Sequence, residues 1–515
     1  MKRLTALTTL AVITVAWIGL AIWMVPALSG SQPSVFGGGS NSGGYTSVDP
    51  DRVEPPCDSP PCITELIEPV DDTDDSEPEV VVPDIPGPAV IDAGSLTFTV
   101  RLSQGLVDPM GTDELYAEVE IEAVDELPDE RPSLNTALVV DRSGSMRTEP
   151  MQRAREAAHT FVDGLDSGDR ASLVAFDHRS EVVMGSTLLD DAGQQQMHSA
   201  IDRLQSSGRT NISGGLQDGF REVDSVESHD GIERIVLMTD GVPNVGITSQ
   251  EGLAAKAAEM RQQGVAVTTL GFGRYNAEMM AAMASEGGGN FRHISSAADL
   301  EQAFGEELDD IQSTVASDLA VDIFESDGVA VEEVHGFSSQ GLRNGERIPV
   351  GDMAAGETRS IVVELDVRQL AAEAGEIFDI VDVRPHFVDH IDGGDVDVTA
   401  SSTIGITEQR EAIDESTDPY VMDRVEELKT VSAVRQAAEL HQQGRSNEAQ
   451  RRLQEEQRRI GDVSAREGSR GASVDRMEGM VESAEEAMEA APSSPEADDS
   501  AGQMETQFFD ASQGR

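Results

Sequence analysis

The stretch Leu138-Val139-Val140-Asp141-Arg142-Ser143-Gly144-Ser145-Met146 decides how this chain of 515 residues is organised. Its apolar run has the length and β-branched content of a buried parallel strand, and it stops at an acid followed by two alternating hydroxyls. Ligands of open α/β sheets gather at the carboxyl ends of such strands. Gly144 gives the turn its backbone freedom, so we expect Asp141, Ser143 and Ser145 to direct their oxygens toward one point.

Two further oxygens stand at similar strand-to-helix corners. Thr210 lies in the glycine-bounded turn of residues 208–215, and Asp240 follows the apolar strand-like run of residues 234–239. Together with the first turn, they make a set of two carboxylates and three hydroxyls without sulfur or imidazole. Such a set suits a hard divalent cation, with Mg²⁺ first and Mn²⁺ or Ca²⁺ as alternatives.

These motifs resemble a known family. Asp-x-Ser-x-Ser, a Thr in the turn Arg209-Thr210-Asn211, and Thr-Asp-Gly after an apolar strand are similar to the von Willebrand factor A (VWA) domain and its metal-ion-dependent adhesion site. The resemblance covers about residues 132–315 and matches all five metal positions. It implies that Ser143, Ser145 and Thr210 coordinate the ion directly, while Asp141 and Asp240 act largely through bound waters. Arg209 stands where many relatives have Gly, which alters the rim of the site.

The pattern of strands and helices predicts the fold class. Alternating strand and helix signals over residues 132–315 predict an α/β domain with a doubly wound, mostly parallel sheet. Strand-like runs in residues 95–131 and 316–407 predict a β-sandwich into which the VWA domain is inserted. Residues 408–460 predict a helical hairpin, and the polar, acid-rich residues 461–515 predict a mostly disordered tail.

The N-terminal region predicts export. Met1-Lys2-Arg3 precedes an apolar run over residues 4–28, long enough to span a bilayer, so residues 1–28 are interpreted as a membrane anchor or, alternatively, a cleaved signal. Residues 29–94 are Gly-, Pro- and acid-rich and predict a disordered stalk. The bulk of the chain is then expected outside the cytoplasm, in the periplasm or at the cell surface, or secreted if the segment is cleaved. Cys57 and Cys62 are expected to form a disulfide there.

Charge and motifs restrict the function. The net charge is −59 with three lysines, which excludes a nucleic-acid-binding surface because phosphate binding needs clustered basic side chains. The resemblance implies binding of a protein partner through an exposed Asp or Glu, with no small-molecule substrate and no catalysis. Two alternatives stay open: a structural or assembly factor of the cell envelope, and a metal-dependent hydrolase. The hydrolase would need a general base or second metal, and the sequence indicates neither.

Overall fold

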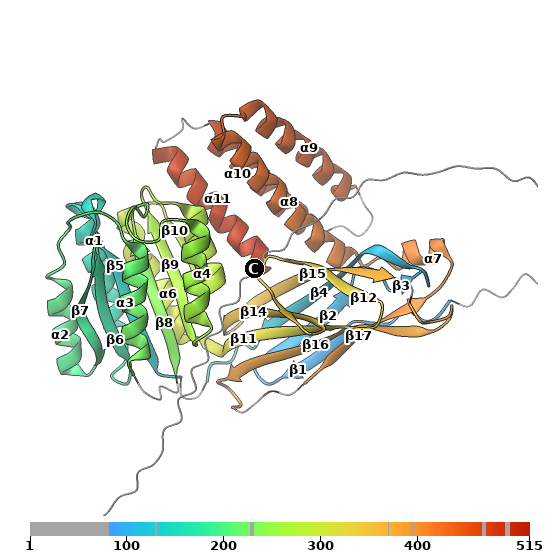
Figure 1. Cartoon of the computed structure of the whole chain (residues 1–515), viewed down its shortest axis with the longest axis horizontal. Helices are drawn as coiled ribbons and strands as arrows, with labels where there is room; N and C mark the ends of the chain where they lie inside the picture. Colours follow the sequence, from blue (N-terminus) through green and yellow to red (C-terminus); the bar gives the residue numbers. More distant parts are fainter. Residues whose placement is uncertain are drawn as a thin grey trace, which may run out of the picture. The chain divides into compact units, whose positions relative to one another are not determined.

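The computed structural model describes residues 82–128, 131–226, 231–368, 370–393, 396, 398–465, 470–489 and 495–515. Within them lie one mostly parallel sheet, two antiparallel-type sheets and a series of C-terminal helices (Figure 1).

The mostly parallel sheet has six strands in the order β10-β9-β8-β5-β6-β7. All neighbouring pairs are parallel except β6 and β7, which form an antiparallel pair at one edge. The central strands are predominantly apolar and buried at every position except Glu233, as expected for a sheet covered on both faces. The strand bounds are β5 Leu134–Asp141, β6 Arg170–Phe176, β7 Ser180–Leu188, β8 Ile232–Thr239, β9 Val265–Phe272 and β10 Gly288–Ile294.

Helices cover both faces of this sheet, as Figure 1 shows. One core cluster lies between the sheet and α1, α2 and α6, and a second lies between the opposite face and α3, α4 and α5. The α/β, doubly wound fold class predicted from the sequence is therefore confirmed. The bounds are η1 Gly144–Met146, α1 Glu149–Asp163, α2 Asp191–Ile201, α3 Ile212–Asp224, α4 Gln250–Arg261, α5 Ala277–Gly287, η2 Ala297–Asp299 and α6 Leu300–Gln312.

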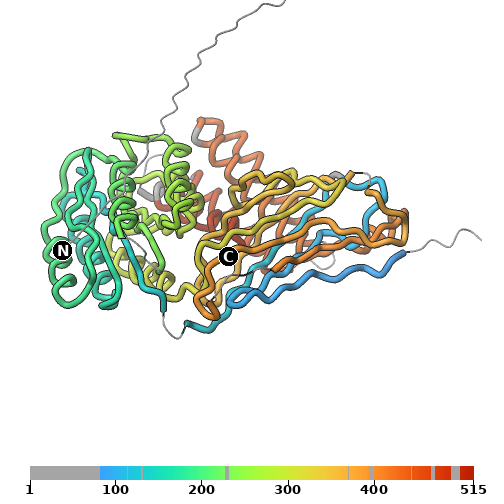
Figure 2. Tube along the Cα trace, turned by 60° about the horizontal axis from the view of Figure 1, so that its bottom comes forward, coloured from blue at the N-terminus to red at the C-terminus, as the bar shows by residue number. Residues whose placement is uncertain are grey.

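The remaining strands form a sandwich of two sheets around one apolar core. One sheet has the order β1-β2-β4-β15-β12 and the other β13-β14-β11-β16-β17-β3, so the α/β domain is inserted between β4 and β11. Figure 2 shows the strands before the insertion lying beside strands that follow it. The bounds are β1 Ala89–Ala93, β2 Leu96–Leu102, β3 Leu106–Val107, β4 Gly111–Ala123, β11 Thr314–Glu325, β12 Val329–His335, β13 Gln340–Leu342, β14 Gly345–Ala354, β15 Thr358–Arg368, β16 Ile377–Asp389 and β17 Ala400–Ile406.

One strand begins earlier than the sequence predicts. Residues 89–93 belong to the stretch predicted as disordered stalk, but they form β1, which pairs antiparallel with β2. Ala93 is buried, and Ala89 and Ile91 pack against the sandwich core. The short apolar alternation gains its stability from this partner strand, which local composition does not reveal.

The C-terminal region is more extensively helical than predicted. Its helices are α7 Arg410–Glu415, α8 Pro419–Gln442, α9 Ser446–Ser464, α10 Gly471–Glu489 and α11 Pro495–Gln513. The prediction of a mostly disordered tail over 461–515 is therefore wrong. The apolar residues of α10 and α11 are sparse, but they are buried in one cluster with those of α8 and α9, including Met477, Ala484 and Phe508. Tertiary burial of these few side chains stabilises helices that an acid-rich composition argues against.

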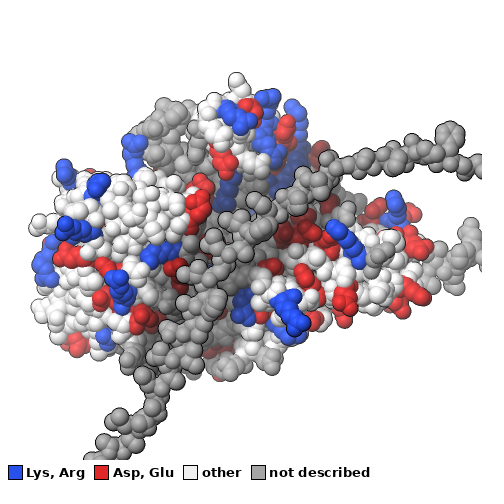
Figure 3. Space-filling model, viewed as in Figure 1, with Lys and Arg blue, Asp and Glu red and all other residues white. Residues whose placement is uncertain are grey.

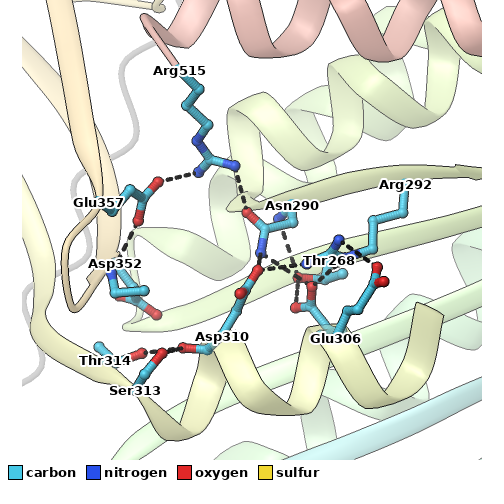
Figure 4. Close-up of polar contacts among 12 residues, drawn as sticks. Thr268, Asn290, Arg292, Glu306, Asp310, Ser313, Thr314, Asp352, Glu357 and Arg515 are labelled. Carbon is cyan, nitrogen blue, oxygen red and sulfur yellow. Dashed lines mark hydrogen bonds and ion pairs between the residues drawn. The ribbon is translucent and has the colours of Figure 1, made fainter. Parts of the chain in front are cut away.

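A partly buried polar network joins the α/β domain, the sandwich and the C-terminal residue that follows α11 (Figure 4). Arg515 donates to Asn290 Oδ1 at 3.0 Å and forms an ion pair with Glu357 at 2.8 Å. Glu307, fully buried on α6, accepts hydrogen bonds from the side chains of Asn290 and Arg234 at 3.1 Å each. Because buried charges are tolerated only when paired, these contacts fix how the three parts meet. We call Arg234, Asn290, Glu307, Asp352, Glu357 and Arg515 the junction network.

The predicted localisation is corrected. Across the described ranges, no helix is long and apolar enough to cross a membrane, so the membrane-anchored placement is not supported. The apolar run of residues 4–28 and the predicted disulfide between Cys57 and Cys62 lie outside the described residues.

On the face shown in Figure 3, acidic side chains lie over strands and helices alike, with Lys and Arg interspersed.

Candidate metal centre

The two acids of the predicted site lie at the same edge of the α/β sheet. Strands β5 and β8 are parallel neighbours, with Val140 opposite Met238 in register. Asp141 is the last residue of β5, and Asp240 directly follows the end of β8. The carboxyl ends of the two strands therefore place both carboxylates side by side at the point where ligands of such sheets bind.

The turn after β5 is organised by the Asp141 side chain. Asp141 Oδ1 accepts a hydrogen bond from the backbone N–H of Ser143 at 2.6 Å, which closes a tight turn before η1. Ser143 Oγ lies 2.9 Å from Ser145 Oγ, and Ser145 Oγ donates to Asp240 Oδ1 at 2.6 Å. Four of the five predicted oxygen-bearing residues are thus connected by direct contacts.

Thr210 joins them from the corner before α3. Its backbone N–H donates to Asn244 Oδ1 at 3.1 Å, and its carbonyl accepts from the Asn244 N–H at 2.9 Å, so the 241–247 loop holds it in place. A carbon at the Cβ position of Gly241 would lie 3.2 Å from Thr210 Oγ1, 3.5 Å from Asp141 Oδ2 and 3.6 Å from Ser145 Oγ. The space beside Gly241 is therefore lined by three oxygens from two separate segments, the turn after β5 and the corner before α3.

Burial makes the two carboxylates electrostatically unfavourable without a cation. Asp141 is fully buried, and loss of hydration raises its pKa to about 7, with the charge of Asp240 adding to this effect. Hydrogen bonds from Thr239 Oγ1, at 2.5 Å, and from Ser143 oppose the rise in pKa. Burial also raises the pKa of Asp240, against the hydrogen bond from Ser145. A bound cation would stabilise the ionised form of both side chains.

The donor chemistry and the geometry fit a hard divalent cation. The converging atoms are carboxylate and hydroxyl oxygens, which are the ligands that Mg²⁺, Mn²⁺ and Ca²⁺ take. Asp141, Ser143, Thr210 and Asp240 are buried, whereas Ser145 is exposed, so the site is held rigidly on one side and open on the other. The structure brings the five residues together, and metal binding by them stays a prediction.

Three supporting residues were not identified from the sequence. Thr239 donates to Asp141, Asn244 fixes Thr210, and Gly241 leaves the central space unfilled. Thr239 and Gly241 flank Asp240 in the Thr-Asp-Gly motif, so their position was visible but their roles were not. Asn244 lies in an irregular loop, and no periodic pattern signals that its side chain caps a backbone group 34 residues earlier.

The rim of the site carries two arginines in different settings. Arg142 is held by ion pairs with Asp177 at 3.2 Å and Glu181 at 2.8 Å, so its charge is compensated locally. Arg209, which precedes the buried Thr210, is exposed. An exposed positive side chain next to a site residue in the sequence favours the approach of an anionic group.

Comparison with known proteins agrees with the fold and the motifs. Residues 135–311 match the family model of the von Willebrand factor type A domain. Residues 135–311 of the chain, within its α/β domain, therefore form a VWA domain.

One curated relative is the uncharacterized protein YfbK of Escherichia coli strain K12, 28% identical over 265 residues. That alignment covers 50% of this chain and 46% of the relative, so the chain spans less than half of the relative's length.

The likeness to solved structures extends beyond the VWA domain. A von Willebrand factor type A protein from Catenulispora acidiphila superposes with a TM-score of 0.65 at 18% identity, covering 83% of this chain and 99% of that chain. The ArnB paralog VWA2 from Sulfolobus acidocaldarius superposes with a TM-score of 0.56 at 17% identity, covering 82% and 98%. At such identities the likeness shows the fold alone, and it includes residues of the sandwich and the C-terminal helices.

Proposed function

We propose that the VWA domain binds a protein partner by holding a divalent metal ion to which a carboxylate of the partner coordinates. The observation that carries the proposal is the convergence of Thr210 Oγ1, Asp141 Oδ2 and Ser145 Oγ around the open space beside Gly241. VWA domains commonly mediate protein–protein interaction, which supports the same class of function.

The charge of the ion explains why a carboxylate would be captured. Ser143, Ser145 and Thr210 would contact the ion through neutral oxygens, while Asp141 and Asp240 would act through bound waters. Neutral ligands leave a dication poorly compensated, so an anionic ligand from outside is favoured at the open position. Ser145 is exposed at this position and Arg209 adds positive charge to the rim, so an Asp or Glu side chain can approach from solvent.

The described contacts favour a binding site over a catalytic one. Ser143 Oγ contacts Ser145 Oγ, which in turn donates to Asp240. Both hydroxyls therefore contact other oxygen-bearing residues of the proposed metal site. Neither contact is the serine–histidine pair that activates a nucleophile. We infer an interaction module without catalytic activity.

A peptide selection tests the proposal. The full-length protein is used to select phage-displayed random peptides in Mg²⁺, with counter-selection on Asp141→Ala and elution by EDTA. We expect the eluted peptides to be enriched in Asp or Glu, and synthetic Asp→Asn or Glu→Gln versions of them to lose binding.

Two outcomes would contradict the proposal in different ways. If the protein takes up Mn²⁺ in a calorimetric titration but selects no acidic peptides, the metal site is present and carboxylate capture is wrong. If Mn²⁺ binds equally to wild type and Asp141→Ala, the metal site itself is wrong. Turnover of a phosphoester or peptide substrate that is lost in Ser143→Ala would instead identify a hydrolase.

A further inference from the structure

Two histidines from different helices of the VWA domain face each other through the same ring nitrogen. His159 lies on α1 and His198 on α2, and their Nδ1 atoms are 2.7 Å apart. The ring centroids are 4.9 Å apart with an interplanar angle of 33°. The side chains are 28% and 29% exposed, so the pair lies at the surface with access from solvent.

The Nε2 atom of each ring, which faces away from the other histidine, lies close to a carboxylate of the opposite helical segment. His159 Nε2 lies 3.1 Å from Asp202, and His198 Nε2 lies 3.0 Å from Asp163. Each histidine also stands four residues before an aspartate of its own segment, so both pairs occupy one face of their helix. Each segment thus contributes one histidine and one aspartate, and each aspartate contacts the histidine of the other segment.

This arrangement leaves two lone pairs directed at each other. Asp202 lies within hydrogen-bond distance of His159 Nε2, and Asp163 lies 3.0 Å from His198 Nε2. These neighbours favour the tautomer with the proton on Nε2, in which a neutral ring has an unprotonated Nδ1. Two such nitrogens repel at 2.7 Å unless a cation lies between them. A proton can occupy that place, which makes one of the rings an imidazolium. A metal ion can replace the proton, because imidazole nitrogens backed by carboxylates are the usual form of histidine metal ligands.

We propose that His159 and His198 bind a transition-metal dication of the Zn²⁺, Ni²⁺ or Cu²⁺ class through their Nδ1 atoms. Bonds of about 2.0–2.1 Å place two cis nitrogens about 2.9 Å apart at a right angle and about 3.3 Å apart at a tetrahedral angle. The present separation of 2.7 Å opens to these values by ring rotations of the exposed side chains. Two neutral imidazoles, the charges of Asp163 and Asp202, and water complete the surroundings of the ion.

This site differs from the oxygen-ligand centre in chemistry and in place. Imidazole nitrogen favours borderline metals in the order that ends with Cu²⁺, whereas the five oxygens around Gly241 suit hard cations. The two sites share no residue, so the proposal does not depend on the proposed function. A bound ion would cross-link α1 and α2 on the outer side of the VWA domain.

Cu²⁺ binding to the full-length chain tests the proposal. The protein carries no polyhistidine tag and has Asp141→Ala, which removes the oxygen-ligand centre from the measurement. Electron paramagnetic resonance should show one Cu²⁺ per chain with coupling to two imidazole nitrogens. His159→Gln or His198→Gln should lower the affinity by at least about 100-fold, and Asp202→Asn by about 10-fold, as expected for the loss of an outer carboxylate.

A third histidine serves as the matched control. His335 on the sandwich lies 3.6 Å from both Glu333 and Glu364, and these three side chains form another group that could hold a metal. His335→Gln should leave the high-affinity Cu²⁺ signal unchanged. Nitrogen-coordinated Cu²⁺ that persists in His159→Gln/His198→Gln, or that is lost in His335→Gln, would overturn the proposal, as would the absence of such a signal in the parent.

Discussion

Burial of Asp141 makes the metal-free VWA domain less stable as the pH rises. Burial raises the pKa of this carboxyl from its ordinary value of 3.8 to about 7 in the folded protein. Between these values the folded chain binds more protons than the unfolded chain, so the free energy of unfolding falls with increasing pH. The stability contributed by the protonated Asp141 carboxyl is fully present below about pH 4 and is lost above about pH 7. A rise of its pKa from 3.8 to about 7 corresponds to on the order of 4 kcal/mol in the free energy of unfolding.

The substitution Asp141→Asn should remove this penalty together with metal binding. Asparagine keeps an oxygen for the Ser143 N–H, and its amide can donate to the Thr239 hydroxyl, which now accepts. In EDTA the variant should therefore gain stability over the wild type between about pH 4 and pH 8, by up to about 4 kcal/mol. Saturating Mg²⁺ at about pH 8 should reverse the order, because only the wild type binds the ion.

Amide hydrogen exchange on the full-length chain measures this difference locally. Protection of peptides from β5 and β8, corrected for the intrinsic pH dependence of exchange, reports the opening free energy of this region. Glu118→Gln is a matched control, since burial raises the pKa of Glu118 in the sandwich to about 7. It should alter the pH dependence of protection in the sandwich and leave the Mg²⁺ response unchanged.

The reasoning would be refuted if wild type and Asp141→Asn showed the same pH dependence in EDTA. Equal protection of Asp141→Asn and wild type by Mg²⁺ would contradict the assignment of Asp141 to the metal centre.

Three further perturbations test other parts of the structure. Gly241→Ala places a methyl carbon within 3.2–3.6 Å of three site oxygens, so Mg²⁺ affinity measured by calorimetry should fall about tenfold or more while circular dichroism stays unchanged. Gly502→Ala should increase proteolysis of α11, although Ala favours helix by about 1 kcal/mol, because its Cβ would lie 2.1 Å from the His293 ring. Glu307→Gln should lower the free energy of unfolding in urea by about 1–3 kcal/mol, since it removes one of the two carboxylates that pair with buried Arg234 and leaves Asp352 as its charged partner.

The strand ends of the VWA domain were predictable because their chemistry is local. The apolar runs that become β5 and β8 are continuous, and each stops at an oxygen-bearing residue, so parallel pairing alone brings Asp141 and Asp240 together. Thr210 was predicted from its glycine-bounded turn at a similar strand-to-helix corner, although this turn precedes α3 and lies far from both strands in sequence. What holds Thr210 in place, the side chain of Asn244, depends on tertiary contact and carries no sequence signal.

The last two helices, α10 and α11, were missed for a different reason. The segments that form α10 and α11 contain few large apolar residues among many acids, so composition alone predicts disorder. Phe508 faces the helical cluster, while the adjacent Phe509 contributes to the core of the VWA domain. Neighbouring side chains that serve two separate cores produce no single helical stripe, which is why periodicity gave no clear prediction. The histidine pair was likewise hidden, because His159 and His198 are 39 residues apart.

The packing of Phe509 against Phe291 has a consequence for biosynthesis. A ribosome produces β10 more than two hundred residues before it produces α11, so the nascent VWA domain exposes an apolar patch throughout that interval. Folding of the sandwich is delayed as well, since β4 can pair with β15 only after the whole inserted VWA domain has been translated. Such distant pairings are slow to form, and the growing chain is therefore most vulnerable to aggregation and to chaperone capture shortly before translation of the helical region is complete.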